Sequence, residues 1–168
     1  MKRRYTKIEW LKMIVGSIEK VGKDEPFLGI WLISDVIEFI GSCMTPSSIR
    51  GKKLQFEFAI KNLDAFKDCR NFKKLYENLR CGLTHDMYPS GSIKLKRTGE
   101  NHSEYNEISY SQLLADLQSS LSEIKRLMGS NPQLKSTMET IYAEVEGDET
   151  SENPLTGSTE SINITFQS

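Results

Sequence analysis

The sequence predicts an all-α protein: a bundle of about five to six helices with a small β-hairpin insertion and a disordered, acidic C-terminal tail. Apolar residues recur at spacings of three and four through most of the chain, as the buried face of a helix requires. Capping signatures and glycine or proline breaks separate these periodic stretches. From Gly147 onward Gly, Ser, Thr, Asn and Glu dominate, a composition typical of disorder. We therefore expect one domain over residues 1–146 and a disordered tail over residues 147–168.

The first two helices are predicted by a capping box and by an unusually apolar segment. Thr6 and Glu9 form the Thr-x-x-Glu box that satisfies backbone amides at a helix start. An apolar stripe follows it, made of Ile8, Leu11, Ile14, Val15, Ile18 and Val21. A break over residues 22–26 ends this helix. The next segment, residues 27–40, is apolar on most faces, which predicts a central or interface helix with Gly41 as its C-cap.

Two further helices are predicted before the middle of the chain ends in a turn. A third helix is expected over residues 52–68, after a loop that contains Pro46 and Gly51. Its candidate core residues are Leu54, Phe58, Ile60, Leu63 and Phe66. Asn71 is a suitable cap for a fourth helix, which Pro89 and Gly91 stop. The apolar stripe of this fourth helix is Phe72, Leu75, Tyr76, Leu79 and Leu83.

The remaining elements are a hairpin and two helices. Residues 93–96 and 106–109 alternate in polarity around a polar turn, which predicts a small β-hairpin. Ser109 and Gln112 form a second capping box for a helix that ends near Gly129. Asn131 followed by Pro132 is an N-cap and N1 pair, and it predicts a last helix through about residue 146.

The composition narrows the classes of function. The chain has 168 residues, of which 38% are hydrophobic and 27% charged, which suits one folded domain. No apolar run approaches the roughly 20 residues that span a bilayer, and Glu9 and Lys12 interrupt the basic start, so neither a membrane segment nor a signal peptide is predicted. Three cysteines without metal-ligand spacing suit a reducing cytoplasm and predict no metal or other cofactor.

The charge is unevenly distributed along the chain. Residues 1–97 hold 19 Lys and Arg against 11 Asp and Glu, whereas residues 98–168 hold 3 against 12. A basic body could bind a polyanion. Alternatively, the opposite charges partly neutralise each other within the fold or between subunits.

One segment combines residues suited to phosphate chemistry. No Gly-rich phosphate loop, HExxH motif or nucleophile elbow is present. Residues 75–89, however, place Arg80 and His85 at the end of an amphipathic helix. A histidine can take the proton of a ribose 2′-hydroxyl near neutral pH, and an arginine can stabilise the charge of the phosphorane, so the pair has what metal-free RNA cleavage requires.

The spacing of this pair constrains the site. Five positions leave two side chains ~140° apart on an ideal α-helix, so the pair converges only if the helix end unwinds or a two-fold partner supplies a second pair. Gly82 would make unwinding easier. Arg97 and His102 repeat the spacing, but they fall in the predicted hairpin turn, where solvent exposure is expected.

The string Leu-Arg-Cys-Gly-Leu-Thr-His, residues 79–85, resembles the Arg-x4-6-His motif of the HEPN superfamily. These proteins are small helical bundles that commonly dimerise along their motif helices. Many are metal-independent ribonucleases of toxin–antitoxin, anti-phage and abortive-infection systems. The resemblance implies a homodimer, an RNA substrate, an antitoxin or other protein partner, and catalytic roles for Arg80 and His85. Two positions depart from the family pattern: Cys81 replaces a frequent polar residue, and Tyr88 gives His-x-x-Tyr in place of His-x-Tyr.

The motif and its neighbours supply the candidate substrate-binding residues, which are Asn78, Cys81, Tyr88, Lys73 and Lys74. Other interpretations stay open. Arg80 could form an ion pair between helices, for instance with Glu77, and His85 could cap a helix C-terminus. The protein would then be a catalytically inactive HEPN-like module that binds RNA or protein, or an unrelated helical oligomerisation scaffold.

Overall fold

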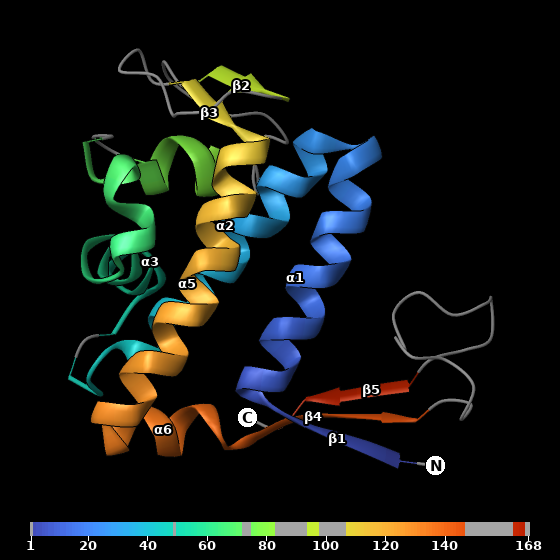
Figure 1. Cartoon of the computed structure of the whole chain (residues 1–168), viewed down its shortest axis with the longest axis vertical. Helices are drawn as coiled ribbons and strands as arrows, with labels where there is room; N and C mark the ends of the chain where they lie inside the picture. Colours follow the sequence, from blue (N-terminus) through green and yellow to red (C-terminus); the bar gives the residue numbers. More distant parts are fainter. Residues whose placement is uncertain are drawn as a thin grey trace.

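Seven helical segments and five short strands make up the described part of the chain in a computed structural model (Figure 1). The structure describes residues 2–48, 50–71, 75–82, 94–97, 107–146 and 163–166. The helical segments are α1 (Lys7–Asp24), α2 (Pro26–Met44), α3 (Lys52–Asn62), η1 (Asp64–Asn71), η2 (Tyr76–Cys81), α5 (Tyr110–Ser130) and α6 (Pro132–Met138). The strands are β1 (Lys2–Thr6), β2 (Lys94–Lys96), β3 (Glu107–Ser109), β4 (Ile141–Glu146) and β5 (Asn163–Phe166). The predicted mostly helical fold is confirmed.

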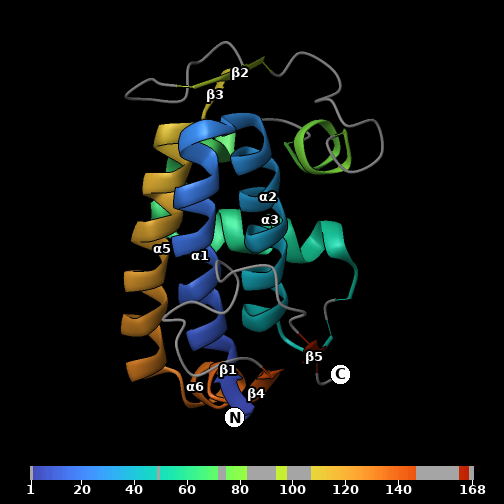
Figure 2. The same ribbon diagram turned by 90° about the vertical axis from the view of Figure 1, so that its right-hand side faces the viewer.

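The apolar helix α2 is the centre of the bundle, as predicted. It packs against α1, α3 and α5, and Figures 1 and 2 show α1, α2 and α5 running side by side. Its inward side chains are almost completely buried; they include Ile30, Ile33, Ile37 and Ile40. Burying each such side chain contributes about 1.5–3 kcal/mol, so this helix supplies much of the core.

By length and composition α2 could also cross a membrane. Half of that stretch, however, is buried inside the protein, as in the core helix of a bundle. Its apolar composition is therefore accounted for by packing.

Glycines on two helices permit close contacts in the core. The sequence predicts Gly41 as a C-cap, but α2 continues to Met44, and a Cβ at Gly41 would collide with the backbone carbonyl of Gln55 on α3. Gly41 is therefore a crossing point between two helices. At the other end of α2, the ring of Tyr110 fills the space above Gly22 and Gly29.

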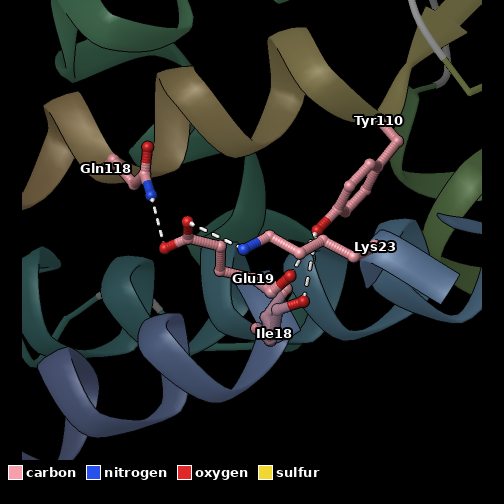
Figure 3. A network of polar contacts seen from close by, with 5 residues as sticks. All are labelled: Ile18, Glu19, Lys23, Tyr110 and Gln118. Atoms are coloured by element: carbon pink, nitrogen blue, oxygen red, sulfur yellow. Dashed lines mark hydrogen bonds and ion pairs between the residues drawn. The ribbon is translucent and has the colours of Figure 1, made fainter. Parts of the chain in front are cut away.

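The hydroxyl of Tyr110 holds its ring in place against Gly22 and Gly29. It donates to the carbonyl oxygens of Ile18 and Glu19, at 3.2 and 3.5 Å, on the neighbouring helix α1 (Figure 3). A buried phenol with a hydrogen-bond partner avoids the cost of desolvating an unpaired hydroxyl. Tyr110 thereby joins the first turn of α5 to the C-terminal half of α1.

The predicted helix starts are confirmed by their capping contacts. The hydroxyl of Thr6 accepts from the amide of Glu9, whose carboxylate accepts from the amide of Thr6. The hydroxyl of Ser109 accepts from the amide of Gln112 at 3.5 Å. Asn131 caps α6, with Pro132 in the first turn.

The last predicted helix is wrong beyond residue 138. Helix α6 ends at Met138, and residues 141–146 form the strand β4. Ala143 and Val145 are buried while Tyr142 and Glu144 are half-buried, which is the period of two of a strand. The short helical stripe of α6 does not extend into this alternation.

Strand β4 is the middle strand of a three-stranded antiparallel sheet of order β1-β4-β5. A small second core lies here, made of Tyr5, Trp10, Ala143 and Val145. Residues 163–166 form β5, so the prediction of a disordered tail does not hold for these four. Residues 147–162 lie outside the described part of the chain.

This sheet also brings part of the basic N-terminal segment next to part of the acidic C-terminal segment. Lys2 of basic β1 lies opposite Glu146 of acidic β4, and Arg4 lies opposite Glu144. The Nε atom of Arg4 is 2.8 Å from the Glu144 carboxylate. The interpretation that opposite charges meet within the fold is supported at this sheet.

The predicted hairpin forms as two paired strands, but the pairing is parallel. Lys94 lies opposite Glu107 and Lys96 opposite Ser109. The stretch between the strands is longer than the two to five residues that fix an antiparallel hairpin. The third predicted helix is also divided, because α3 ends at Asn62 and the 3₁₀ segment η1 follows. Leu54, a predicted core residue, is 51% exposed.

Candidate functional site

The candidate site is built around a single π-helical turn. Residues 76–81 form η2, with helical backbone at Leu75 before it and at Gly82 after it. Leu75, Tyr76 and Leu79 are buried and hold the turn against the bundle. Single π turns within helices frequently occur at functional sites, because the extra residue changes the direction of the side chains that follow.

Arg80 points from this turn toward the middle of α2. Its Nε atom lies 2.7 Å from Oε2 of Glu38 and 3.4 Å from Oδ1 of Asp35. Neither contact has the direction of a hydrogen bond at these atoms, so the interaction is an ion pair with two carboxylates. The Arg80 side chain is 12% exposed, and a charge so deeply buried requires partners of this kind.

A lysine extends the cluster on the α3 side. The Nζ atom of Lys52 is 3.7 Å from Oε1 of Glu38. Two carboxylates therefore face two cations, and the four formal charges balance. We call Asp35, Glu38, Lys52 and Arg80 the ion cluster.

The surroundings of Asp35 shift the pKa of its carboxyl group. Burial raises its pKa above the usual aspartate value, Arg80 and Lys52 partly oppose that effect, and Glu38 adds to it. The Asp35 side chain is nevertheless 45% exposed, against 13% for Glu38. The cluster thus reaches solvent on the Asp35 side.

Tyr76 adds a hydroxyl to the same region. Burial raises its pKa, as do Cys81 and Glu38, whereas Arg80 lowers it. Its ring packs edge-on against Phe56, with the centroids 5.4 Å apart. Tyr76 therefore keeps its proton at neutral pH.

Glu77 pairs with a different cation from the one that the sequence suggested. Its carboxylate accepts from Nζ of Lys53 at 2.7 Å, in a contact close to half exposed on both sides. The inter-helix ion pair predicted as an alternative for Arg80 does form, but with Asp35 and Glu38 of α2. The hydrogen bond to Glu77 and the charge of its carboxylate raise the pKa of Lys53.

Three of the sequence-predicted site residues are described by the structure. Arg80, Asn78 and Cys81 all lie on η2, and the side chains of Asn78 and Cys81 are partly buried. The others, His85, Tyr88, Lys73 and Lys74, lie outside the described residues. Their approach to Arg80 stays a prediction.

The second Arg–His pair has a structural contact at its arginine. The guanidinium of Arg97 donates to the carbonyl oxygen of Lys23 at 2.6 Å. This carbonyl lies in the last turn of α1, where carbonyl groups lack helical partners. Arg97 thus caps a helix, and His102 lies outside the described residues.

Sequence reasoning missed the two carboxylates that hold Arg80. Asp35 and Glu38 are the charged residues between positions 26 and 44. They stand three positions apart, hence on one face of a helix that is otherwise apolar. A pair of acids on a core helix requires a cation from a neighbouring element, and this signal could have identified the partner of Arg80.

The cysteines are free thiols in the described structure. Cys43 and Cys69 are buried, and burial raises the pKa of both. Both therefore suit the interpretation as small core residues. Among the described residues, no group of three His, Cys, Asp or Glu could hold a metal ion.

The chain matches no protein-family model, no curated protein and no solved structure.

The raised pKa of Asp35 predicts a pH-dependent difference between the wild type and Asp35→Asn. The folded state binds the Asp35 proton more tightly than the unfolded chain does. The free energy of unfolding therefore falls as the pH rises from the pKa of Asp35 in the unfolded chain through its pKa in the folded state. Asp35→Asn removes that loss. The variant should match the wild type near pH 3 and have the higher melting temperature at pH 7. Thermal unfolding at both pH values measures this, with exposed Asp68→Asn as the control. A lower melting temperature for Asp35→Asn at pH 7 would contradict it.

Proposed function

We propose that this protein is a HEPN-like, metal-independent endoribonuclease in which Arg80 and His85 act on the scissile phosphate. The observation that carries the proposal is the position of Arg80. It follows the buried residues of an inner helical turn, and two carboxylates of the central helix fix its guanidinium. An arginine held in this way is oriented before any substrate arrives, and orientation is a large part of catalysis.

The reaction begins at the ribose. His85 takes the proton of the 2′-hydroxyl, whose oxygen attacks the phosphorus and forms a new O–P bond. The bond from phosphorus to the 5′ oxygen breaks, and that oxygen receives a proton. The products are a 2′,3′-cyclic phosphate and a 5′-hydroxyl. Arg80 stabilises the negative charge that builds up on the phosphorane oxygens.

The carboxylates support this role through orientation. Both contact Arg80 at Nε, the inner nitrogen of the guanidinium, which fixes the side chain close to its stem. The partial exposure of Asp35 leaves this part of the cluster open to solvent. We further propose that two copies of the chain associate along their motif helices, and that the protein acts in bacterial toxin–antitoxin or anti-phage defence, with an antitoxin or other partner protein. These last roles rest on the motif resemblance.

A second function is favoured by the charge balance of the ion cluster. Two carboxylates and two cations compensate one another, so Arg80 would have to weaken existing ion pairs in order to stabilise a phosphate. Cys81 stands next to it in place of the polar residue that active HEPN proteins often carry. The alternative is a catalytically inactive HEPN-like module that binds RNA or protein.

Cleavage of single-stranded RNA in EDTA distinguishes the two functions. The wild type should cleave and leave cyclic-phosphate ends, and His85→Ala should be slower by about 10²–10⁴-fold because it lacks the general base. His102→Ala is the matched control, since it removes the other histidine of the chain, and it should cleave at the wild-type rate.

Arg80→Lys tests the arginine separately. It keeps the charge that faces the carboxylates but loses the planar fork of donors, so a folded Arg80→Lys protein with much slower cleavage supports a role at phosphate. Equal cleavage by the wild type and His85→Ala would contradict the proposed site. RNA binding with a steep salt dependence and no cleavage would favour the inactive module.

A further inference from the structure

Positively charged residues line a cleft beside β1 and α1. It is formed by residues of β1 and α1 and has a volume of about 400 Å³. It is lined by Arg3, Arg4, Tyr5, Glu9, Lys12, Met13, Gly16 and Lys20. We call it the basic cleft, since four of its eight lining residues are cations and one is an acid.

The acid of the cleft is already engaged. The carboxylate of Glu9 accepts from the backbone amide and the hydroxyl of Thr6, at 2.9 and 2.8 Å. These two contacts, followed by Lys12 and Arg3, hold the pKa of Glu9 below its usual range. Glu9 is therefore ionised and fixed as part of the α1 cap.

Among the residues that the structure describes, neighbouring acids leave most of the positive charge uncompensated. Glu144 pairs with Arg4, whose side chain remains 65% exposed. Glu19 is next to Lys20 in sequence, but Figure 3 shows its carboxylate between the amide of Gln118 and the ammonium of Lys23, at 3.2 and 4.0 Å. Within the described part of the chain, Lys12 and Lys20 form no ion pair with a carboxylate.

The part of the cleft wall formed by α1 has two lysines with a glycine between them. Lys12, Gly16 and Lys20 stand at successive positions four apart, on one face of the helix. A Cβ at Gly16 would meet nothing within 4 Å. The two lysines are thus about 12 Å apart along the helix axis, and the half-buried Gly16 lies between them.

This arrangement suits a chain of phosphates better than a single anion. One phosphate is usually held by donors that converge on it from a helix end or a nest of amides. Here the cations are spread along the cleft, which fits the regular charges of a nucleic-acid backbone. The aromatic residues do not stack on bases, because Tyr5 and Trp10 are 6% and 8% exposed in the second core.

We propose that the basic cleft binds the phosphates of an RNA strand, apart from the residues that cut it. Arg3 and Arg4 on β1 and Lys12 and Lys20 on α1 make the contacts, and these contacts carry no base specificity. The choice of RNA rests on the proposed function, whereas the affinity for a polyanion rests on the cleft alone.

The test is binding of a fluorescent single-stranded RNA to full-length His85→Ala protein, measured against salt concentration. Adding Lys12→Ala and Lys20→Ala should weaken binding on the order of 10-fold at low salt and reduce the slope of log K against log salt by about 1.4. The control replaces Lys67 and Lys125, two exposed lysines of η1 and α5, and should bind as the parent does.

Gly16→Glu gives a second, independent variant, because it places a carboxylate in the open middle of the cleft. It should weaken RNA binding, while Gly129→Glu should not. Gly129 is the suitable control because its Cβ would also meet nothing within 4 Å, on a different helix. Circular dichroism establishes that each variant is folded.

The outcomes separate this proposal from the proposed function. The proposed RNA site in the basic cleft is overturned if both cleft variants bind RNA as the His85→Ala parent does, or if the parent binds no RNA. This holds even if the wild type cleaves RNA. Weaker binding by the cleft variants supports it even if the wild type cleaves nothing. Single-stranded DNA should bind the cleft with similar affinity, because contacts to phosphates alone do not distinguish ribose from deoxyribose.

Discussion

Arg80→Ala is expected to lower the free energy of unfolding by about 3–5 kcal/mol, the cost of leaving a buried charge without its partner. Glu38 is 13% exposed and lies 2.7 Å from Arg80. Removing the guanidinium leaves that carboxylate facing Asp35, and Lys52, at 3.7 Å, is then the nearest remaining cation among the described residues. Urea unfolding at neutral pH measures the change.

An exposed ion pair between η2 and α3 provides the control. Lys53 and Glu77 are 2.7 Å apart, but their side chains are 48% and 44% exposed. Lys53→Ala should therefore cost much less stability than Arg80→Ala. A similar, small cost for Arg80→Ala would contradict a structural role for the ion cluster.

Removing the charges together tests the cause of the loss. Arg80→Ala combined with Asp35→Asn and Glu38→Gln leaves no unpaired charge at these three positions, and the cost of breaking a buried ion pair comes largely from the charge that is left behind. The triple variant should recover most of the stability that Arg80→Ala loses. If it does not, the loss comes from packing of the arginine stem and not from charge.

The stability of Arg80 variants also decides how their activity is to be interpreted. Arg80→Ala would lose cleavage both by losing the phosphate contact and by loosening η2. Arg80→Lys and the charge-neutral triple variant separate these effects, since both should keep the turn in place. A triple variant that is folded and inactive would assign Arg80 to the chemistry, provided that His85→Ala is inactive as well.

The helices were predictable because each has its own signals. The capping box of Thr6 and Glu9 and the Asn131-Pro132 pair act over three or four residues, so local sequence determines them. The apolar composition of residues 27–40 likewise predicted a central helix, because a helix that is apolar on most faces must be buried on most faces. Strand β4 was missed because this short segment begins only two residues after α6 ends, and because its pairing with β1 joins the two ends of residues 2–146.

The candidate site was predictable only in part, for a similar reason. Arg80 was identified from its motif, but its partners lie more than forty positions away on α2, and no periodicity connects them. Gly41 was misinterpreted for the same reason, since nothing local distinguishes a glycine that ends a helix from one that another helix crosses. The structural roles of Arg80 and Gly41 both depend on contacts between elements that are distant in the sequence.

Gly41→Ala is expected to destabilise the protein by about 3 kcal/mol, at the upper end of the range for overpacked cores. The new methyl group would collide with the carbonyl carbon and oxygen of Gln55. A side chain in that place could rotate away, but here the obstacle is the backbone of α3, so the two helices must separate. Gly41→Val should cost more, because a branched side chain adds volume in the same place.

Gly16→Ala is the matched control for this crossing, because both glycines lie within helices and only one is crowded. A Cβ at Gly16 meets nothing, so the substitution should stabilise the protein by about 0.5–1 kcal/mol through the higher helix propensity of alanine. Urea unfolding of both variants gives the comparison. If Gly41→Ala were stabilising to the same extent, α2 and α3 would not cross as closely as described, and the position of Glu38 beside Lys52 and Arg80 would need to be revised with them.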